Sequence, residues 1–222
     1  MKAVLIPVKD LGQAKQRLAP VLTQADRTKL ALAMMQDVFA AVTAARGVDR
    51  VFLVSSYGPA IERGRDLGWE IINEERQTCE SDSVDYASGL CAERGVAALL
   101  RLPIDIPLVQ PEDIDWLMHE VEQAPSVVIV PSGSGGTNAI LRSPPTLFPS
   151  HFGPGSLAKH SEEAQAKGAR CKILRNERIE LDVDEAKDLR ALLTHGAGRQ
   201  SAAVRWLTAS GIASAITGSS RG

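Results

Sequence analysis

The chain has 222 residues, a formal net charge of −2 at neutral pH and 44% apolar residues. This length and composition fit one soluble globular domain, and the charge provides no basic field for nucleic acid. No apolar run approaches the roughly 18 residues of a membrane span, and the first apolar run starts too early for a signal peptide to precede it. We therefore expect a cytoplasmic protein whose partners are small molecules, with no nucleic acid and no membrane among them.

The spacing of the cysteines and histidines indicates neither a zinc site nor a disulfide framework. The three cysteines are far apart and form no Cys-x-x-Cys pair: Cys79, Cys91 and Cys171. The four histidines are also scattered: His119, His151, His160 and His195. Such spacing predicts neither a disulfide scaffold nor a zinc site, and it indicates no catalytic triad. We expect structural or surface roles for the histidines.

The first half of the chain alternates short apolar runs with segments of helical spacing. Strands are expected at 3–6, 51–54, 69–72, 96–102 and 127–130, and helices at 23–46, 59–67, 83–94 and 111–121. Short unbroken apolar runs are typical of strands buried on both faces of a parallel sheet. The alternation predicts an α/β fold, with a mostly parallel sheet and helices on both of its faces.

The second half is less regular. Glycines at 133, 135 and 136 and prolines at 144 and 145 flank the apolar piece 139–141, which predicts an inserted hairpin. Further helices are expected at 156–167, 185–194 and 200–207, and strands at 171–174 and 179–183. We expect one domain over residues 1–212 and a disordered tail over 213–222, because the tail is small and polar. The apolar segment from Val204 to Ile216 would suit burial in a homodimer.

A basic loop, from Pro7 to Leu18, directly follows the first expected strand and contains Lys9, Lys15 and Arg17. In open α/β sheets, ligands bind beyond the carboxyl ends of the strands. We interpret the three cations as a grip on a triphosphate, with bidentate geometry at Arg17 and point charges at the lysines. The alternative is a solvated basic turn before a helix.

Three carboxylates also lie at the ends of expected strands or just beyond them. Asp105 comes after the strand at 96–102, and Asp182 and Asp184 are spaced so that both can point to one face. Together they would form an all-oxygen site suited to Mg²⁺, held partly by a substrate phosphate. The alternatives are a turn role for Asp105 beside proline and an N-cap role for Asp184.

Two glycine-rich stretches lie in the second half. Residues 131–138 follow a strand and end in Thr137 and Asn138, whose side chains could donate hydrogen bonds to an anion beside the glycine backbone. Gly153 and Ser156 precede a helix whose N-terminal amides favour phosphate or carboxylate. Neither stretch is a Walker A loop or a dinucleotide-binding fingerprint. A flexible surface turn and an ordinary serine cap are the alternatives.

In combination, these motifs resemble the 2-phospho-L-lactate guanylyltransferase family, which makes the activated three-carbon precursor of coenzyme F-420. The motifs that carry the resemblance are the basic loop, Asp105-x-Pro107, Gly-Gly-Thr-Asn-Ala at 135–139, Phe-Gly-x-Gly-Ser at 152–156 and Asp182-x-Asp184. The resemblance extends over residues 2–195 in the same order. It implies a single-domain, Rossmann-like nucleotide-diphospho-sugar-transferase fold, with residues 1–212 as the nucleotidyltransferase domain.

The resemblance also implies roles for individual residues. Asp105, Asp182 and Asp184 would hold Mg²⁺ as the cofactor. The expected acceptor-binding residues are Thr137, Asn138, Gly153 and Ser156. The expected nucleotide-binding residues are Pro7, Lys9, Lys15, Arg17 and Asp82, of which Lys15 and Arg17 would also be catalytic by offsetting charge on the leaving pyrophosphate.

The chain departs from the family pattern in two places. The family often has Asp-Leu-Asn before a helix, whereas this chain has Asp82-Ser83-Val84, so Val84 replaces an asparagine that contacts the nucleotide. The metal-binding aspartate often stands in Ala-Asp-Leu-Pro, whereas here Ile104 precedes Asp105 and Ile106 follows it.

The reaction that this resemblance implies is transfer of GMP from GTP to a three-carbon phospho acid, with release of pyrophosphate. The acceptor is phosphoenolpyruvate, 2-phospho-L-lactate or 3-phosphoglycerate, and the sequence leaves the choice open. A phosphate monoester is mostly dianionic at neutral pH and can attack without a general base. Two alternatives remain: a nucleotidyltransferase for another cofactor or a sugar phosphate, and a non-catalytic nucleotide-sensing module, which would not need three carboxylates.

Overall fold

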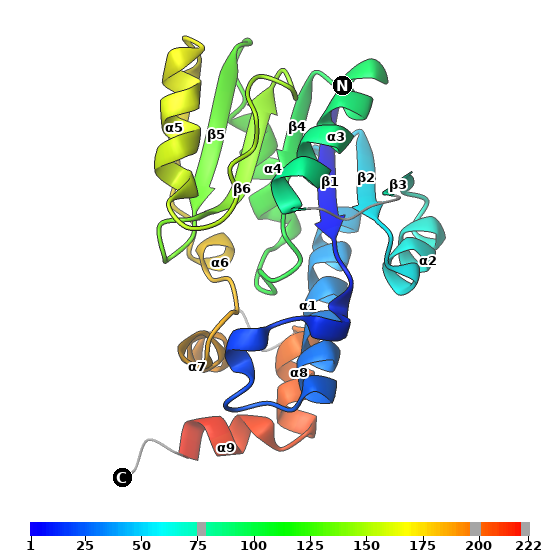
Figure 1. The fold of residues 1–222 in the computed structure, drawn as a ribbon, viewed down its shortest axis with the longest axis vertical. Coiled ribbons are helices and arrows are strands. Elements are labelled where there is room, and N and C mark those ends of the chain that lie inside the picture. The colour runs from blue at the N-terminus through cyan, green and yellow to red at the C-terminus, as the bar shows by residue number, and fades with distance from the viewer. Residues whose placement is uncertain (75–78, 196–200, 219–222) are drawn as a thin grey trace.

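A seven-stranded sheet organises the chain in the computed structural model, which describes residues 1–74, 79–195 and 201–218 (Figure 1). The strand order is β3-β2-β1-β4-β6-β5-β7, and β6 runs antiparallel to both of its neighbours while the other pairs are parallel. The strands are β1 Lys2–Val8, β2 Arg50–Ser55, β3 Glu70–Asn73, β4 Ala98–Arg101, β5 Ser126–Pro131, β6 Thr137–Ser143 and β7 Arg170–Ile173. The predicted mostly parallel α/β sheet and the predicted hairpin around 139–141 are confirmed.

Helices cover both faces of the sheet. The helices α1, α2 and α4 pack on one face, and α3 and α5 on the other. Their bounds are α1 Gln24–Ala44, α2 Gly58–Asp66, α3 Glu80–Glu93, α4 Pro111–His119, α5 Ser156–Ala166, α6 Glu177–Glu180, α7 Ala186–Thr194, α8 Ala202–Ala209 and α9 Ile212–Gly218, with two 3₁₀ turns at Leu11–Gln13 and Gln16–Leu18.

Strand β1 shows why its apolar run becomes a central strand. Side chains alternate across a strand, so Val4 and Ile6 join the core cluster that contains α1, whereas Ala3 and Leu5 join the cluster that contains α3. All four are fully buried. A strand that needs an apolar residue at every position is one with helices on both sides.

A second apolar cluster lies away from the sheet, where the N-terminal half of α1 meets the C-terminal helices (lower part of Figure 1). Leu30 and Met34 of α1 pack in it with Leu192 of α7 and Leu207 of α8. Asp37 of α1 caps α8 by accepting hydrogen bonds from the backbone N–H groups of residues 202 and 203. This cluster positions the basic loop opposite the carboxyl ends of the strands.

The strand predicted at 179–183 is wrong. The structure has the short helix α6, whose N-cap Asn176 accepts hydrogen bonds from the backbone N–H groups of Arg178 and Ile179. The chain then passes through an irregular segment in which the Val183 N–H donates to the Asp105 carbonyl. These backbone groups bond to caps and loops, so no ladder with a neighbouring strand forms.

The disordered tail predicted at 213–222 is wrong over its described part. Residues 212–218 form α9, and Ile216 is buried in the second cluster because the small, polar segment still presents an apolar side chain to α7 and α8. Residues 219–222 lie outside the described part of the chain, as does residue 200 at the start of the helix expected at 200–207. Leu207 and Ile216 thus pack within their own chain, which removes the sequence argument for a homodimer.

Among the described helices, none combines the length and apolar character that crossing a membrane requires. All three cysteines are free thiols.

Candidate active site

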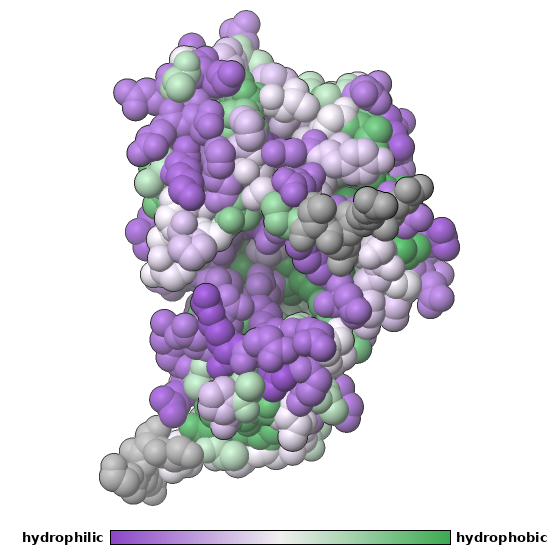
Figure 2. Space-filling model, in the orientation of Figure 1, coloured by the Kyte–Doolittle hydropathy of each residue, from purple (hydrophilic) through white to green (hydrophobic). Residues whose placement is uncertain are grey.

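A cavity of about 480 Å³ opens where the carboxyl ends of the parallel strands face the basic loop. Figure 2 shows this hollow between the sheet-bearing part of the molecule and the smaller part below it, with hydrophilic residues around it. The predicted site residues that line the cavity are Pro7, Lys9, Lys15, Arg17, Asp105, Thr137, Asn138, Gly153, Asp182 and Asp184. Asp82 and Ser156 do not line it. Folding therefore gathers residues from both halves of the chain at one sheet edge.

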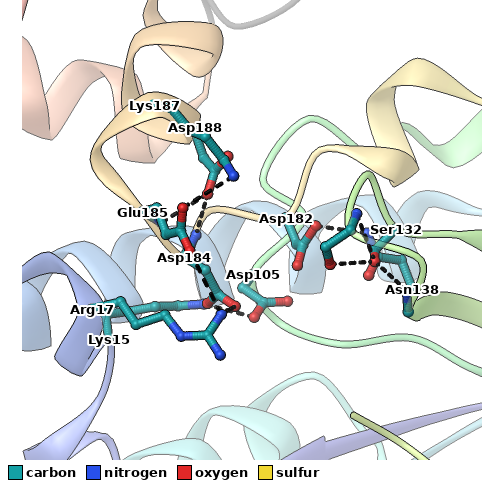
Figure 3. Close-up of polar contacts among 12 residues, drawn as sticks. Lys15, Arg17, Asp105, Ser132, Asn138, Asp182, Asp184, Glu185, Lys187 and Asp188 are labelled. Carbon is teal, nitrogen blue, oxygen red and sulfur yellow. Dashed lines mark hydrogen bonds and ion pairs between the residues drawn. The ribbon is translucent and has the colours of Figure 1, made fainter. Parts of the chain in front are cut away.

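Lys15 forms the central ion pairs of the cavity (Figure 3). Its Nζ lies 2.6 Å from Oδ2 of Asp105 and 2.7 Å from Oδ1 of Asp184. Burial alone would lower the pKa of Lys15, but the two carboxylates outweigh burial and raise it. Burial alone would raise the pKa of Asp105, yet Lys15 and, more weakly, Arg101 bring it below its ordinary value. At neutral pH the Lys15 ammonium and the Asp105 carboxylate are therefore both charged.

The backbone of Lys15 supports this placement. With φ 55 and ψ 46, Lys15 is the non-glycine residue in the described chain that adopts a positive φ. The left-handed conformation is unfavourable for a residue with a Cβ, so tertiary contacts must hold it. The two ion pairs of the Lys15 side chain and the hydrogen bond from the Leu18 N–H to the Lys15 carbonyl are contacts that can do so.

Arg17 occupies the rim of the cavity rather than its floor. Its Nη1 lies 4.0 Å from Oδ2 of Asp184 and 3.9 Å from Oε1 of Glu185, and the side chain is 67% exposed. Exposed pairs at such distances add little stability. The guanidinium is therefore available to an incoming anion, as is expected of a group that binds phosphate.

Asp182 lies on the other side of Asp105, next to Asn138 (Figure 3). The Asn138 amide Nδ2 donates to Oδ1 of Asp182 at 3.2 Å and to the Ile179 carbonyl at 2.8 Å. Burial raises the pKa of Asp182, and the negative charges of Asp105 and Asp184 add to this increase. Asn138 thus positions the Asp182 carboxylate next to two other negatively charged side chains.

The three aspartates fit Mg²⁺ in donor chemistry, because they are hard oxygen ligands near one another. Within the described residues, however, no three His, Cys, Asp or Glu side chains are arranged to hold a metal ion. The Lys15 ammonium stands between Asp105 and Asp184, where a shared cation would lie. The magnesium assignment stays a prediction, and in the structure Lys15 already pairs with two of the three carboxylates.

The loop from Ser132 to Gly136 joins β5 to β6 and forms one wall. The Ser132 hydroxyl accepts a hydrogen bond from the Gly136 N–H at 2.9 Å, which closes the loop on itself. A Cβ on Gly136 would lie 2.8 Å from this oxygen, so a larger residue would displace the Ser132 hydroxyl. Gly135, with φ 83, also adopts a conformation that favours glycine.

Ser156 lies behind this wall. It is fully buried at the first position of α5, and its Oγ has no hydrogen-bond partner among the described residues. A Cβ built on Gly136 would lie 3.7 Å from that Oγ, so the two residues are neighbours. Direct contact between Ser156 and a ligand in the cavity would require the glycine-rich loop to shift.

Arg101 is a cavity residue that the sequence analysis missed. Its guanidinium donates to the carbonyls of Asn138, at 3.0 Å, and Thr137, at 3.4 Å, and it pairs with Glu80 of α3. It also stacks over the Phe152 ring, 4.1 Å from the centroid. Burial lowers the pKa of Arg101 to about 10, so it stays a cation at neutral pH. The sequence signal that could have identified Arg101 is that it is a lone arginine in an otherwise apolar strand. A buried charge requires polar partners, so such a residue is a candidate for a site.

The residues predicted to contact the nucleotide, 82–84, do not line the cavity. Asp82 is exposed on the first turn of α3, and Glu80 is the α3 residue that lines the cavity. Val84 is fully buried in the core cluster that contains β1 and β2. A buried valine offers no polar group to a base, so this chain has no substitute for the family asparagine at that position.

Comparison with solved structures agrees with the predicted fold. The chain superimposes with a TM-score of 0.78 on a putative nucleotide-diphospho-sugar transferase from Desulfovibrio desulfuricans G20, at 17% identity and with 97% of each chain covered. A nucleotidyl transferase from Methanothermobacter thermautotrophicus gives a TM-score of 0.57 at 15% identity, covering 86% of this chain and 95% of that one. At these identities the likeness shows the fold alone. The protein has the fold of a nucleotide-diphospho-sugar transferase, with a cavity at the sheet edge where this architecture binds ligands.

The chain belongs to the family described as guanylyl transferase CofC like, whose profile matches residues 1–222. A curated relative from Rubrobacter xylanophilus, named phosphoenolpyruvate guanylyltransferase, is 35% identical over 193 residues, which is 86% of this chain and 93% of the relative. Another from Methanothermobacter thermautotrophicus, named 2-phospho-L-lactate guanylyltransferase, is 34% identical over 194 residues, with 87% and 85% covered. The family predicted from the motifs is confirmed.

Proposed function

We propose that this protein transfers GMP from GTP to the phosphate of a three-carbon phospho acid and releases pyrophosphate, as a cytoplasmic step of coenzyme F-420 biosynthesis. The observation that carries the proposal is one shared cavity. Its lining includes two cations of the basic loop, the three aspartates and Thr137. Cations suited to a triphosphate, carboxylates suited to a divalent ion and donors suited to a small acid line the same space. The printed names of the relatives support this substrate class.

The nucleophile is the phosphate of the acceptor. A phosphate monoester is mostly dianionic at neutral pH, so no side chain has to remove a proton before attack on the α-phosphorus of GTP. In agreement, no histidine is among the described residues that line the cavity. The reaction forms a phosphorus–oxygen bond to the acceptor and breaks the bond to pyrophosphate, which leaves with the electron pair.

Charge stabilisation is the main task of the basic loop. Lys15 and Arg17 would offset the negative charge that grows on the leaving pyrophosphate, and Lys9 would bind the same phosphates. Asp105, Asp182 and Asp184 would hold Mg²⁺, which when bound neutralises phosphate charge. Because Lys15 is paired with Asp105 and Asp184 in the structure, GTP binding would exchange carboxylate partners of Lys15 for phosphate partners.

The glycine-rich side of the cavity would position the acceptor. Thr137 and Asn138 begin β6 directly beside the loop that ends at Gly136. Gly153 lines the cavity just before α5, and its φ of 118 is accessible to glycine. Holding two reactants in line supplies much of the rate enhancement in such reactions.

The test is pyrophosphate release by the purified protein with GTP, Mg²⁺ and phosphoenolpyruvate, 2-phospho-L-lactate or 3-phosphoglycerate in turn. We expect release with at least one acceptor, loss of release when EDTA is added, and weaker release when ATP or CTP replaces GTP. Asp105→Asn should be inactive, whereas Asp66→Asn, on the exposed side of α2, should match the wild type. No release with any acceptor, from a protein that still binds GTP, would favour the sensing module.

A further inference from the structure

His160 of α5 is a fully buried histidine whose two ring nitrogens both have partners. The backbone N–H of His151 donates to Nε2 at 2.9 Å. On the other side of the ring, Nδ1 lies 3.0 Å from Oγ1 of Thr137, a residue that lines the cavity. The ring thus joins the backbone before α5 to a predicted acceptor contact.

These two contacts determine the tautomer. A nitrogen that accepts a hydrogen bond from a backbone N–H carries no proton, so Nε2 of His160 is unprotonated. In the neutral ring the proton is then on Nδ1, and Nδ1 donates to the Thr137 hydroxyl. Burial, reinforced by the charges of Arg142, His151, Arg101 and Lys159, lowers the pKa of His160 to about 3, which agrees with a neutral ring.

The Thr137 hydroxyl consequently has a defined direction. Because its oxygen accepts from Nδ1 of His160, it cannot donate to that nitrogen. Within the described residues, Oγ1 has His160 as its hydrogen-bond partner and no acceptor for its own proton. Thr137 is 93% buried and lines the cavity, so its proton is left for an acceptor that binds there.

We infer that His160 is a positioning residue that holds the Thr137 hydroxyl as a hydrogen-bond donor toward an anionic oxygen of the acceptor. The inference rests on the proposed function, because that function places the anionic acceptor beside Thr137. A hydroxyl that donated to the histidine would have no proton left for a ligand, whereas a hydroxyl that accepts from Nδ1 keeps its proton for an acceptor such as an anionic oxygen. Charge-assisted hydrogen bonds of this kind are stronger than neutral ones.

The packing around the ring maintains this orientation. Phe152 meets the His160 ring edge-on, with centroids 5.3 Å apart, and Phe148 and His151 lie at 6.1 and 5.9 Å. A flipped ring would place a carbon against the His151 N–H and leave that donor unsatisfied. Gly153 and the aromatic Phe152 come from the same loop, so the histidine also links the two acceptor-side segments.

Two conservative variants separate the two bonds of His160. Asn places an amide near the position of Nδ1 and can keep the donor to Thr137, whereas Gln reaches the position of Nε2 and can keep the acceptor for His151. We expect His160→Gln to raise the KM for the acceptor about 10-fold with little change in the KM for GTP. His160→Asn should stay within about 3-fold of the wild type. The surface variants His119→Asn and His119→Gln serve as controls.

A double-mutant cycle links the effect to Thr137. Thr137→Val should raise the acceptor KM about as much as His160→Gln does, and the double variant should be no worse than Thr137→Val alone. Additive losses, or an unchanged KM in His160→Gln, would overturn the inference. Equal losses in His160→Asn and His160→Gln, accompanied by equal losses of thermal stability, would assign the histidine a purely structural role and also overturn it.

A direct measurement on the wild type does not depend on activity or on folding of a variant. Long-range ¹H–¹⁵N spectra of protein labelled at histidine distinguish the two neutral tautomers. We expect His160 to carry its proton on Nδ1, and a proton on Nε2 would refute the inference. If the wild type releases no pyrophosphate while this tautomer is found, the proposed function fails and the hydroxyl orientation stands.

Discussion

The ammonium of Lys15 lies 2.6 Å from Oδ2 of Asp105, although 90 positions of sequence separate the two residues. The same ammonium contacts Asp184. A cation of the basic loop therefore occupies the space between two carboxylates that are expected to bind a metal ion. The contact therefore links the basic loop, which is expected to bind the GTP phosphates, to the carboxylates that are expected to bind Mg²⁺.

Lys15→Met should increase the affinity of the free protein for Mg²⁺ and still impair catalysis. Without the ammonium, Asp105 and Asp184 lack their counterion, so Mg²⁺ should bind at least about 10-fold more tightly. Turnover of GTP should fall at least about 100-fold, because a charge against the leaving group is lost. Calorimetric titration of Mg²⁺ without nucleotide measures the first effect. Lys29→Met, exposed on α1, is the matched control; an unchanged Mg²⁺ affinity in Lys15→Met would contradict this competition.

Two isosteric variants should separate stability from activity. Asp105→Asn breaks an ion pair with Lys15 and should lower the free energy of unfolding by about 2 kcal/mol. Asp182→Asn removes a carboxylate whose pKa is raised by burial and by its acidic neighbours, so stability should be unchanged or higher. Both variants should lose at least about 100-fold in turnover. Urea unfolding and pyrophosphate release test the pair, and wild-type turnover in either variant would remove that residue from the metal site.

Gly136→Ala should damage the acceptor side. The new Cβ would lie 2.8 Å from Oγ of Ser132 and would break the hydrogen bond that closes the loop. We expect the acceptor KM to rise at least about 10-fold, since the loop positions Thr137. Gly133→Ala, where a Cβ meets nothing within 4 Å, should have a smaller effect.

A second variant tests the cause of that damage. Ser132→Ala removes the clashing oxygen, so Ser132→Ala/Gly136→Ala should recover part of the acceptor affinity that Gly136→Ala loses. If the double variant is as poor as Gly136→Ala alone, the contact with Ser132 is not the cause.

The free energy of unfolding should fall at mildly acidic pH because of His160. Its pKa is about 3 in the folded chain and about 6.5 when unfolded, so the unfolded state binds the proton first as the pH falls. The stabilisation is complete above about pH 6.5 and is lost toward pH 3. Between pH 7 and pH 5 this group alone should remove about 2 kcal/mol. Urea unfolding at both pH values measures the loss, and His160→Gln should reduce the difference by that amount; an equally steep dependence in the variant would assign it to other groups.

The sequence was sufficient for the sheet and for most of the cavity wall. Apolar runs such as that of β1 indicate burial on both faces, and residues at the ends of such strands must meet at one edge. Hence the sequence predicts that Lys15, Asp105 and Thr137 lie at the same edge of the sheet. The strand expected at 179–183 failed because Asn176 caps a short helix that ends at Glu180, and the Val183 N–H beyond it bonds to the Asp105 carbonyl instead of to a strand.

Residues 213–218 and Arg101 also differ from what their local sequence predicts, because their contacts come from distant parts of the chain. The composition of residues 213–218 is that of a mobile segment, but Ile216 has an apolar cluster to enter, and burial there outweighs weak local signals. Arg101 was overlooked because its partners Glu80, Phe152 and the β6 carbonyls come from other parts of the chain.

By itself, the sequence determined the α/β architecture, the family and the kinds of group at the site, because these follow from local periodicity and from motifs that are contiguous in the chain. Only the tertiary structure decided which groups touch: that Lys15 stands between Asp105 and Asp184, that Ser156 lies behind the glycine-rich loop, and that His160 orients Thr137. Such contacts depend on side chains brought together by packing over long sequence separations, and no local pattern encodes the distance between two atoms.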